Sequence, residues 1–274
     1  MLLALDIGNS SISLGIFDTQ VPQDDSPALV FTGKLSSDTG RTADEYIILL
    51  RGLLGARTSD ITEAVMGSVV PQLTHTLEAA VRRLCGDALP ILHMGGGVRS
   101  GIHLRVDDPA ALGADIVTNA AAAARLCGTP VIFFDYGTAT VCGAVNAARE
   151  LIGVIIAPGV QTSLEGLRAA AAQIPYLELK PPEALLGKST SASIRSGLIT
   201  GTACMTDELI GRLRTELCIS PDSPLPVVAT GGLAPLVLPH CRHSLRHEPA
   251  LTLMGLCFIH GATRERATKH AKHG

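Results

Sequence analysis

The sequence has no tryptophan, and aromatic residues make up only 3% of its 274 residues. It also lacks an excess of positive charge, because 22 lysine and arginine residues face 25 aspartate and glutamate residues. Few aromatic rings argue against a surface that stacks nucleic-acid bases, and a net charge of −3 argues against an electrostatic footprint for nucleic acid or an anionic membrane. We therefore expect a small-molecule partner, with no nucleic acid and no membrane.

Long apolar runs and paired cysteines are missing as well. No apolar run approaches the roughly 18 residues of a membrane-spanning helix. The seven cysteines are odd in number and never spaced as Cys-x-x-Cys, which argues against a disulfide framework or a zinc knuckle. Reduced thiols are typical of the cytoplasm, which is the expected location. The hydrophobic content of 46% is sufficient for a substantial core.

The chain does contain one pattern of strands and turns that occurs twice. Residues 2–17 and residues 131–145 each show an apolar strand, the pattern Asp-x-Gly and a second β-capable run, and the two aspartates are Asp6 and Asp135. Helical spacing follows the first copy at residues 42–54, and another helix is expected to begin near Pro109. The sequence predicts an α/β fold of duplicated βββαβα domains, residues 1–114 and 115–274, with a last helix that can pack back on the first domain.

Three glycine-containing loops have the chemistry of a nucleotide site. A glycine lets backbone amides approach a phosphate, and a carboxylate at a strand end such as Asp6 can hold hydrated Mg²⁺. One such loop could equally be a plain hairpin with a solvated aspartate, but two facing loops could clamp a triphosphate, with Thr138 donating a hydroxyl hydrogen bond. Gly231-Gly232 would let a nucleoside approach the backbone, or would form an ordinary strand-to-helix turn.

Six motifs occur in a distinctive order. They are Asp6-Ile7-Gly8-Asn9, Gly113-Ala114-Asp115, Asp135-x-Gly137-Thr138-Ala139-Thr140, Gly-Val-Ile-Ile-Ala-Pro-Gly at residues 153–159, Gly187-Lys188-Ser189-Thr190 and Thr230-Gly231-Gly232-Leu233-Ala234. In this order the chain resembles the type III pantothenate kinases, the family that includes the Bvg accessory factor proteins. The resemblance runs from Met1 to about Leu256.

The resemblance implies an actin-like (ribonuclease H-like) fold with an interdomain nucleotide cleft. It implies an enzyme, a phosphotransferase that uses ATP to convert pantothenate to 4'-phosphopantothenate in the first step of coenzyme A biosynthesis. It also implies a homodimer, Mg²⁺, and a monovalent cation such as K⁺ or NH₄⁺.

Site roles carry over residue by residue. Asp115 is similar to the family's general base, which would accept the hydroxyl proton as the γ-phosphoryl group arrives; otherwise it is a helix carboxylate with a structural partner. The cofactor-binding residues would be Asp6, Gly8, Asn9, Ser10, Ser11, Ser13, Gly137, Thr138, Gly231 and Gly232. The substrate-binding residues would be Gly113, Ala114, Asp115, Ile116, Val106 and Thr190. The metal ligands would be Asp6 for Mg²⁺ and Asp135 for the monovalent cation.

The sequence departs from the family pattern at two acceptor positions and in the second hairpin, where Val141 stands in place of a further threonine. Ile116 stands where the family has an arginine that grips the pantothenate carboxylate, and Val106 stands where a tyrosine is common. An apolar side chain cannot replace a guanidinium that pairs with a carboxylate. Two alternatives therefore stay open, a kinase for another hydroxylated small molecule and a non-catalytic nucleotide-binding regulator. Arg99 or Arg105 could also supply the missing charge.

Overall fold

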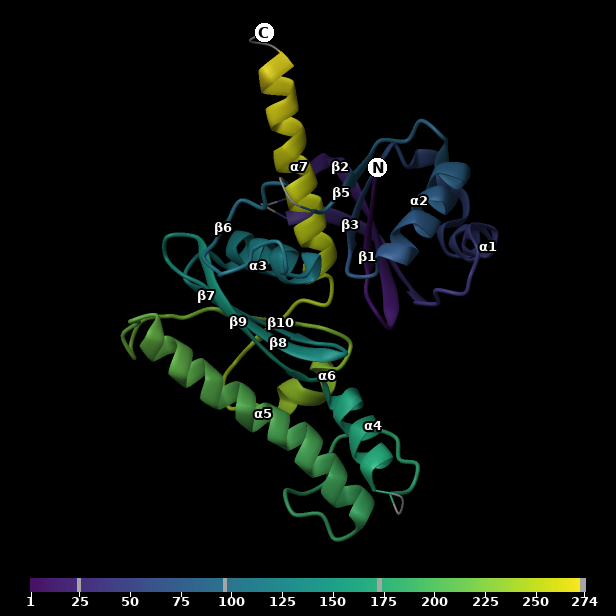
Figure 1. Cartoon of the computed structure of the whole chain (residues 1–274). Coiled ribbons are helices and arrows are strands. Elements are labelled where there is room, and N and C mark those ends of the chain that lie inside the picture. The colour runs from purple at the N-terminus through teal and green to yellow at the C-terminus, as the bar shows by residue number, and fades with distance from the viewer. Residues whose placement is uncertain (24–25, 96–97, 172–173, 272–274) are drawn as a thin grey trace. The chain divides into compact units, whose positions relative to one another are not determined.

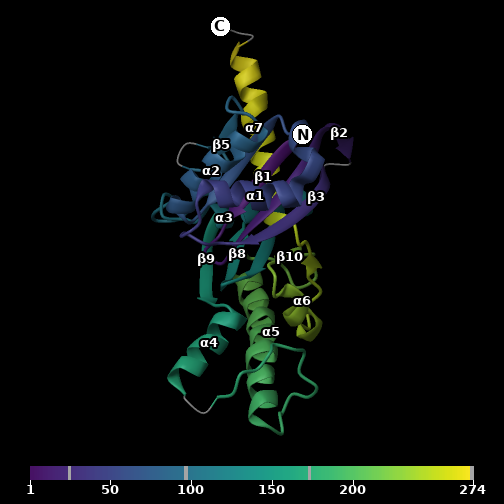
Figure 2. The ribbon, with the colours of Figure 1, turned by 90° about the vertical axis from the view of Figure 1, so that its right-hand side faces the viewer.

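The structure is a computed structural model that describes residues 1–23, 26–95, 98–171 and 174–271. The chain forms two compact units, shown in Figures 1 and 2. The first comprises Met1–His103, Asp107–Leu126 and the chain from Ala250 onward, and the second comprises Leu104–Val106 and Cys127–Pro249. None of the helices in these described stretches has the length and apolar character needed to cross a membrane.

The first unit contains a five-stranded sheet in the order β3-β2-β1-β4-β5. Its strands are β1 (Leu2–Ile7), β2 (Ser11–Gln23), β3 (Ser26–Ser36), β4 (Glu63–Ser68) and β5 (Ile91–His93). β1, β2 and β3 pair antiparallel, whereas β4 runs parallel to β1 and β5 parallel to β4. The helical elements of this unit are α1 (Ala43–Leu54), η1 (Gly55–Asp60), α2 (Pro71–Cys85), α3 (Ala114–Cys127, whose last residue belongs to the second unit) and α7 (Leu251–Ala271).

Both faces of this sheet are apolar. Successive side chains of a strand point to opposite faces, so Leu3 and Leu5 of β1 pack with α1 and α2, while Leu2 and Ala4 pack with α7. Figure 1 shows α7 beside the strands and α1 beside α2. Burial on both faces explains why β1 is a continuous apolar run rather than an alternating one.

Local sequence signals set where the first helices begin. The Thr42 hydroxyl accepts a hydrogen bond from the Glu45 N–H (3.3 Å), and the Glu45 carboxylate accepts one from the Thr42 N–H (2.8 Å). This reciprocal capping box satisfies two backbone donors at the start of α1. α2 begins at Pro71, whose fixed backbone angle suits the first helical turn.

Within the first unit, the helices α3 and α7 pack closely against each other. A side chain on Gly255 of α7 would collide with the backbone of Thr118 on α3. The Thr252 hydroxyl also donates to the Asn119 side-chain oxygen (2.7 Å). The expected division between residues 114 and 115 therefore falls at the start of a helix that packs within the first unit, and α3 begins at Ala114 rather than near Pro109.

The second unit repeats the plan in a six-stranded sheet of order β11-β10-β7-β8-β9-β6. Its strands are β6 (His103–Leu104, whose first residue groups with the first unit), β7 (Val131–Tyr136), β8 (Ala139–Val145), β9 (Glu150–Pro158), β10 (Val227–Thr230) and β11 (Arg246–His247). β7, β8 and β9 pair antiparallel and β10 runs parallel to β7, as β4 does to β1. The duplicated βββαβα plan is confirmed.

One face of the second sheet is covered by helices. They are α4 (Val160–Ala170), α5 (Thr190–Glu216), α6 (Ala234–Val237) and η2 (Leu238–His240). Figure 2 shows α4 and α6 beside the long helix α5. Tyr136 at the end of β7 is fully buried, and its hydroxyl lies 2.8 Å from that of Thr206 on α5. The end of β7 is thereby tied to α5.

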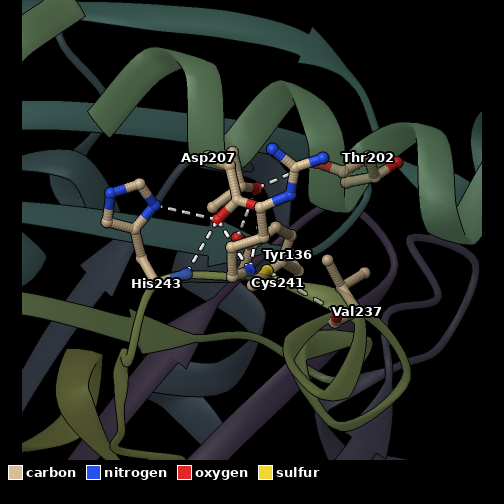
Figure 3. A network of polar contacts seen from close by, with 8 residues as sticks. Tyr136, Thr202, Asp207, Val237, Cys241 and His243 are labelled. Carbon is tan, nitrogen blue, oxygen red and sulfur yellow. Dashed lines mark hydrogen bonds and ion pairs between the residues drawn. The ribbon is translucent and has the colours of Figure 1, made fainter. Parts of the chain in front are cut away.

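A half-buried carboxylate, that of Asp207, fastens the segment after η2 to α5, as Figure 3 shows. Asp207 accepts hydrogen bonds from the backbone N–H groups of Arg242 (2.8 Å) and His243 (3.0 Å), and it lies 3.0 Å from His243 Nδ1. Burial raises the pKa of Asp207, but these donors outweigh the burial, so the pKa of Asp207 lies below its ordinary value. In this state Asp207 is a charged acceptor at neutral pH.

We expect Asp207→Asn to lower the free energy of unfolding at neutral pH by roughly 1.5 to 3 kcal/mol, the usual contribution of a hydrogen bond to a charged group. Because the folded pKa of Asp207 is depressed, this contribution is present above the ordinary aspartate pKa and is lost as pH falls through the folded value. The melting temperature of Asp207→Asn should therefore lie below that of the parent protein at neutral pH, and the difference should be smaller at acid pH.

Glu208→Gln is the matched control for this change. Glu208 follows Asp207 on α5 and forms an exposed ion pair with Arg212 (2.8 Å), which contributes little to stability. Equal melting temperatures for the two variants at neutral pH would contradict the fastening role of Asp207.

Candidate active site

The first turn, residues 8–10, connects β1 to β2 where β1 ends. Asp6 on β1 is half-buried and pairs in register with Ser13 on β2 and with Gly67 on β4, which adds no side chain beside the carboxylate. The Gly8 N–H donates to the Ser11 carbonyl (3.0 Å), and the residues between them are exposed. The first turn therefore presents backbone and side-chain donors next to a carboxylate.

The start of α3 lies at the same edge of the first sheet. An added Cβ at Gly113 would be 3.4 Å from Cγ1 of Val69, just beyond β4. An added Cβ at Gly67 would be 3.8 Å from the Cβ of Ala114. Because Gly67 is the register partner of Asp6, the end of β1 and the start of α3 meet across one glycine.

Asp115 occupies the first turn of α3, where the helix dipole favours a carboxylate. Its side chain is half-buried, and one of its oxygens accepts a hydrogen bond from the Ile116 N–H (2.9 Å). A side chain on Gly113 would collide with the same oxygen, so the Asp115 carboxylate can adopt this position only because residue 113 is a glycine. A partly exposed, oriented carboxylate of this kind can accept a proton from a bound hydroxyl.

The predicted acceptor residues differ in accessibility. The side chain of Ile116 is only 7% exposed and belongs to the buried face of α3. It leaves little surface for a substrate, and a guanidinium there would have to reach out of an apolar layer. Val106 is half-buried after β6, and Thr190 is an exposed residue that begins α5.

The second turn, at Gly137 and Thr138, is held by the start of α4. The Gly137 N–H donates to the Ala139 carbonyl (3.0 Å), and the Thr138 carbonyl accepts from the Gly159 N–H (3.0 Å) and the Thr162 hydroxyl (2.6 Å). A side chain on Gly159 would collide with the carbonyl oxygens of Gly137 and Thr138. Only glycine at 159 allows α4 to begin this close to the second turn.

The third glycine loop lies against the end of β7. Gly231 has a φ of 94°, and a side chain there would collide with Asp135 Oδ1 and the backbone of Tyr136. The Leu233 N–H donates to the Tyr136 carbonyl (3.0 Å), and Gly232 is exposed. Asp135 and the second and third glycine loops therefore come together within the second unit.

The predicted ligands suit a Mg²⁺ ion that binds together with a nucleotide. Across the described residues, no three His, Cys, Asp or Glu side chains gather into a metal-binding cluster. Mg²⁺ commonly takes one or two carboxylates and completes its shell with substrate phosphates and water. Asp6, half-buried beside the first turn, could supply such an oxygen.

The structure thus brings the predicted residues into two groups. The first unit gathers Asp6, Gly8, Asn9, Ser10, Ser11, Ser13, Gly113, Ala114 and Asp115 at the ends of β1 and β4. The second gathers Asp135, Gly137, Thr138, Gly231 and Gly232. That the two turns face one another stays a prediction. Sequence reasoning missed Gly159 and Thr162 as individual residues, although the Pro158-Gly159 pair at a strand end was a signal for a close turn.

Comparison with solved structures shows the fold. A protein from Campylobacter jejuni assigned to the Baf family of transcriptional activators aligns with a TM-score of 0.57 and 13% identity, covering 96% of this chain and 99% of that one. A protein from Sinorhizobium meliloti described as a 2-dehydro-3-deoxygalactonokinase aligns with a TM-score of 0.53 and 15% identity, covering 96% of each chain. At these identities the likeness concerns the fold, which is the duplicated actin-like fold.

Sequence comparison defines the family. The family model of the type III pantothenate kinases matches residues 2–212. The type III pantothenate kinase of Streptomyces griseus is 38% identical over 274 residues, covering 97% of this chain and 100% of the relative. The one from Frankia alni is 40% identical over 259 residues, covering 94% and 98%. The chain belongs to the type III pantothenate kinase family.

We expect Gly159→Ala to weaken ATP binding, because the new methyl group must push the second turn away from α4. A displacement of this kind should cost about tenfold or more in KM for ATP. Steady-state kinetics with varied ATP measures it. Gly166→Ala, on the same helix with open space around the added methyl group, is the control and should behave like the parent protein. Equal KM values for the two variants would remove Gly159 from the site.

Proposed function

We propose that this protein transfers the γ-phosphoryl group of ATP to the primary hydroxyl of pantothenate, which gives 4'-phosphopantothenate in the first step of coenzyme A biosynthesis. Membership in the type III pantothenate kinase family supports the reaction. The observation that carries the proposal is that the start of α3, with Asp115 in its first turn, lies near Gly67, the register partner of Asp6. A proton acceptor and a phosphate-binding turn at the same edge are the parts that a hydroxyl kinase needs.

In this proposal Asp115 is the general base. Its carboxylate accepts the proton of the acceptor hydroxyl, and its bond from the Ile116 N–H keeps one oxygen oriented while the other can serve the substrate. Asp6 holds the metal side of the nucleotide, and the amides of the first turn bind phosphate oxygens. Bound Mg²⁺ would neutralise charge that develops on the transferred group. Asp135 is the proposed ligand of a monovalent cation, K⁺ or NH₄⁺.

The residues predicted to bind the phosphoryl acceptor leave one alternative for the substrate. Pantothenate carries a carboxylate, and Ile116 offers it no charge. Arg105 is exposed after β6, although its guanidinium lies 3.6 Å from Glu150 Oε1, so binding a substrate carboxylate there would compete with an ion pair. An acceptor without a carboxylate would avoid this competition, which favours a kinase for a neutral hydroxylated compound as the second candidate.

We expect Asp115→Asn to lower kcat with pantothenate by about a hundredfold or more, because general-base catalysis typically contributes 10²–10⁴. Phosphate transfer from ATP should be measured with pantothenate, with neutral alcohols of similar size and with no acceptor. Asp44→Asn is the matched control, since Asp44 is also in the first turn of a helix and forms an exposed ion pair with Arg83 (2.7 Å). Turnover of a neutral alcohol but not of pantothenate would favour the second candidate, and no turnover with any acceptor would favour a regulator.

The assembly that we propose is a homodimer in the cytoplasm. Three large apolar side chains of residues 151–167 are exposed, Ile155 (39%) and Ile156 (62%) of β9 and Leu167 (41%) of α4. Exposed apolar side chains are common in subunit interfaces, and a twofold dimer would cover the same residues on both copies. All seven cysteines are free thiols, which suits a reducing compartment.

We expect the parent protein to sediment as a dimer at micromolar concentration, and Ile156→Glu to weaken the dimer by at least about tenfold because it would bury a charge in the interface. Ile48→Glu is the control, because Ile48 is 71% exposed on α1, outside this stretch. Sedimentation over a concentration series distinguishes the outcomes. A parent protein that stays monomeric would contradict the dimer, and an unchanged Ile156→Glu dimer would move the interface elsewhere.

A further inference from the structure

A residue outside the predicted set contacts both ends of the first turn. Ser37, just after β3, donates its hydroxyl hydrogen to the Gly8 carbonyl (2.5 Å) and its N–H to the Ser10 carbonyl (3.2 Å). We propose that Ser37, fixed in place by Tyr46, is a positioning residue that orients the first turn to bind the phosphates of the nucleotide. This inference rests on the proposed ATP-dependent function, and all of its contacts lie within the first compact unit.

Ser37 determines which way two peptide groups of the first turn face. In a planar trans peptide the carbonyl and the following N–H point in opposite directions. The Gly8 carbonyl is directed at the Ser37 hydroxyl, so the Asn9 N–H is directed away from it. In the same way the Ser10 carbonyl faces the Ser37 N–H, and the Ser11 N–H faces away. Two oxygens that would repel phosphate are thus held toward Ser37, and two potential phosphate donors face the other way.

The position of Ser37 is set through the next residue. The Tyr46 hydroxyl donates to the Asp38 carbonyl (3.0 Å) and accepts from the Asp38 N–H (3.1 Å). The Tyr46 ring is fully buried and packs in the core between the first sheet and α1. A single buried hydroxyl therefore binds both backbone groups of Asp38, which fixes the direction in which the chain leaves β3.

The segment from residue 37 to residue 42 is braced further by its own side chains. Asp38 Oδ1 accepts from the Gly40 N–H (3.0 Å), and Asp38 Oδ2 lies 3.3 Å from Arg41 Nε. The capping box of α1 begins directly afterwards at Thr42. The packing of α1 is therefore transmitted through a short, hydrogen-bonded connection to the carbonyl groups of the first turn.

The experiment compares nucleotide binding in full-length variants. Ser37→Ala should lower the affinity for AMP-PNP with Mg²⁺ by roughly three- to tenfold, the effect of one ordinary net hydrogen bond, when measured by titration calorimetry. KM for ATP should rise by a similar factor, while KM for pantothenate should stay unchanged. Ser37→Thr keeps the hydroxyl and should recover most of the affinity. Tyr46→Phe should weaken nucleotide binding in the same direction, and its effect should not add fully to that of Ser37→Ala.

Ser59→Ala is the matched control, because it removes another serine hydroxyl that donates to a backbone carbonyl, that of Ala56 (2.9 Å), in the same unit. Equal AMP-PNP affinity for Ser37→Ala and Ser59→Ala would overturn the proposal, even if Ser37→Ala melted earlier. If Ser37→Ala does not fold, Tyr46→Phe decides, and parent-like affinity in that variant would overturn it as well.

The test also separates this inference from the proposed function. AMP-PNP binding does not require pantothenate, so a parent protein that binds the analogue without phosphorylating pantothenate refutes the proposed acceptor and still reports on Ser37. A parent protein that fails to bind AMP-PNP refutes both.

Discussion

The structure depends on one arrangement that occurs twice, an antiparallel hairpin whose first strand also pairs in parallel with a later strand. In the first unit this register sets Asp6 beside Gly67, and in the second it sets Asp135 beside Thr230. The carboxyl ends of parallel strands meet at one edge of a sheet, so the loop that follows each later strand lies next to the hairpin turn. Each aspartate therefore receives its neighbours from the topology rather than from nearby sequence.

The sequence predicted the structural elements whose signals are local or periodic. The two hairpins were predictable because each turn combines glycine with small polar residues between apolar strands, and α1 was predictable from its spacing and its acidic first turn. The resemblance supplied the actin-like fold, which the solved structures confirm. The signals for the hairpins and for α1 each lie within a few residues of one another, whereas the resemblance depends on the order of motifs along the whole chain.

The parts that escaped prediction depend on contacts between distant residues. The helix α3 joins α7 through Gly255, and an alanine-rich helix shows no preference for one partner in its sequence. Ile116 follows the predicted base, yet helical geometry turns it into the core while Asp115 stays half-buried. Ser37 lies 29 residues from Gly8, and a serine after a strand has no pattern that would mark it as a contact to a phosphate-binding turn.

The two proposed sides of the site differ in what a substitution would change. The proposed nucleotide side consists largely of backbone groups, which are oriented by neighbours such as Gly159 and Ser37 and by glycines that admit no side chain. A change at such a position moves the backbone and with it the turn. The proposed acceptor side depends on side chains, and replacing one of them would change a contact to the substrate without disturbing the hairpins. Specificity can therefore change on the acceptor side while the phosphate-binding turns stay intact.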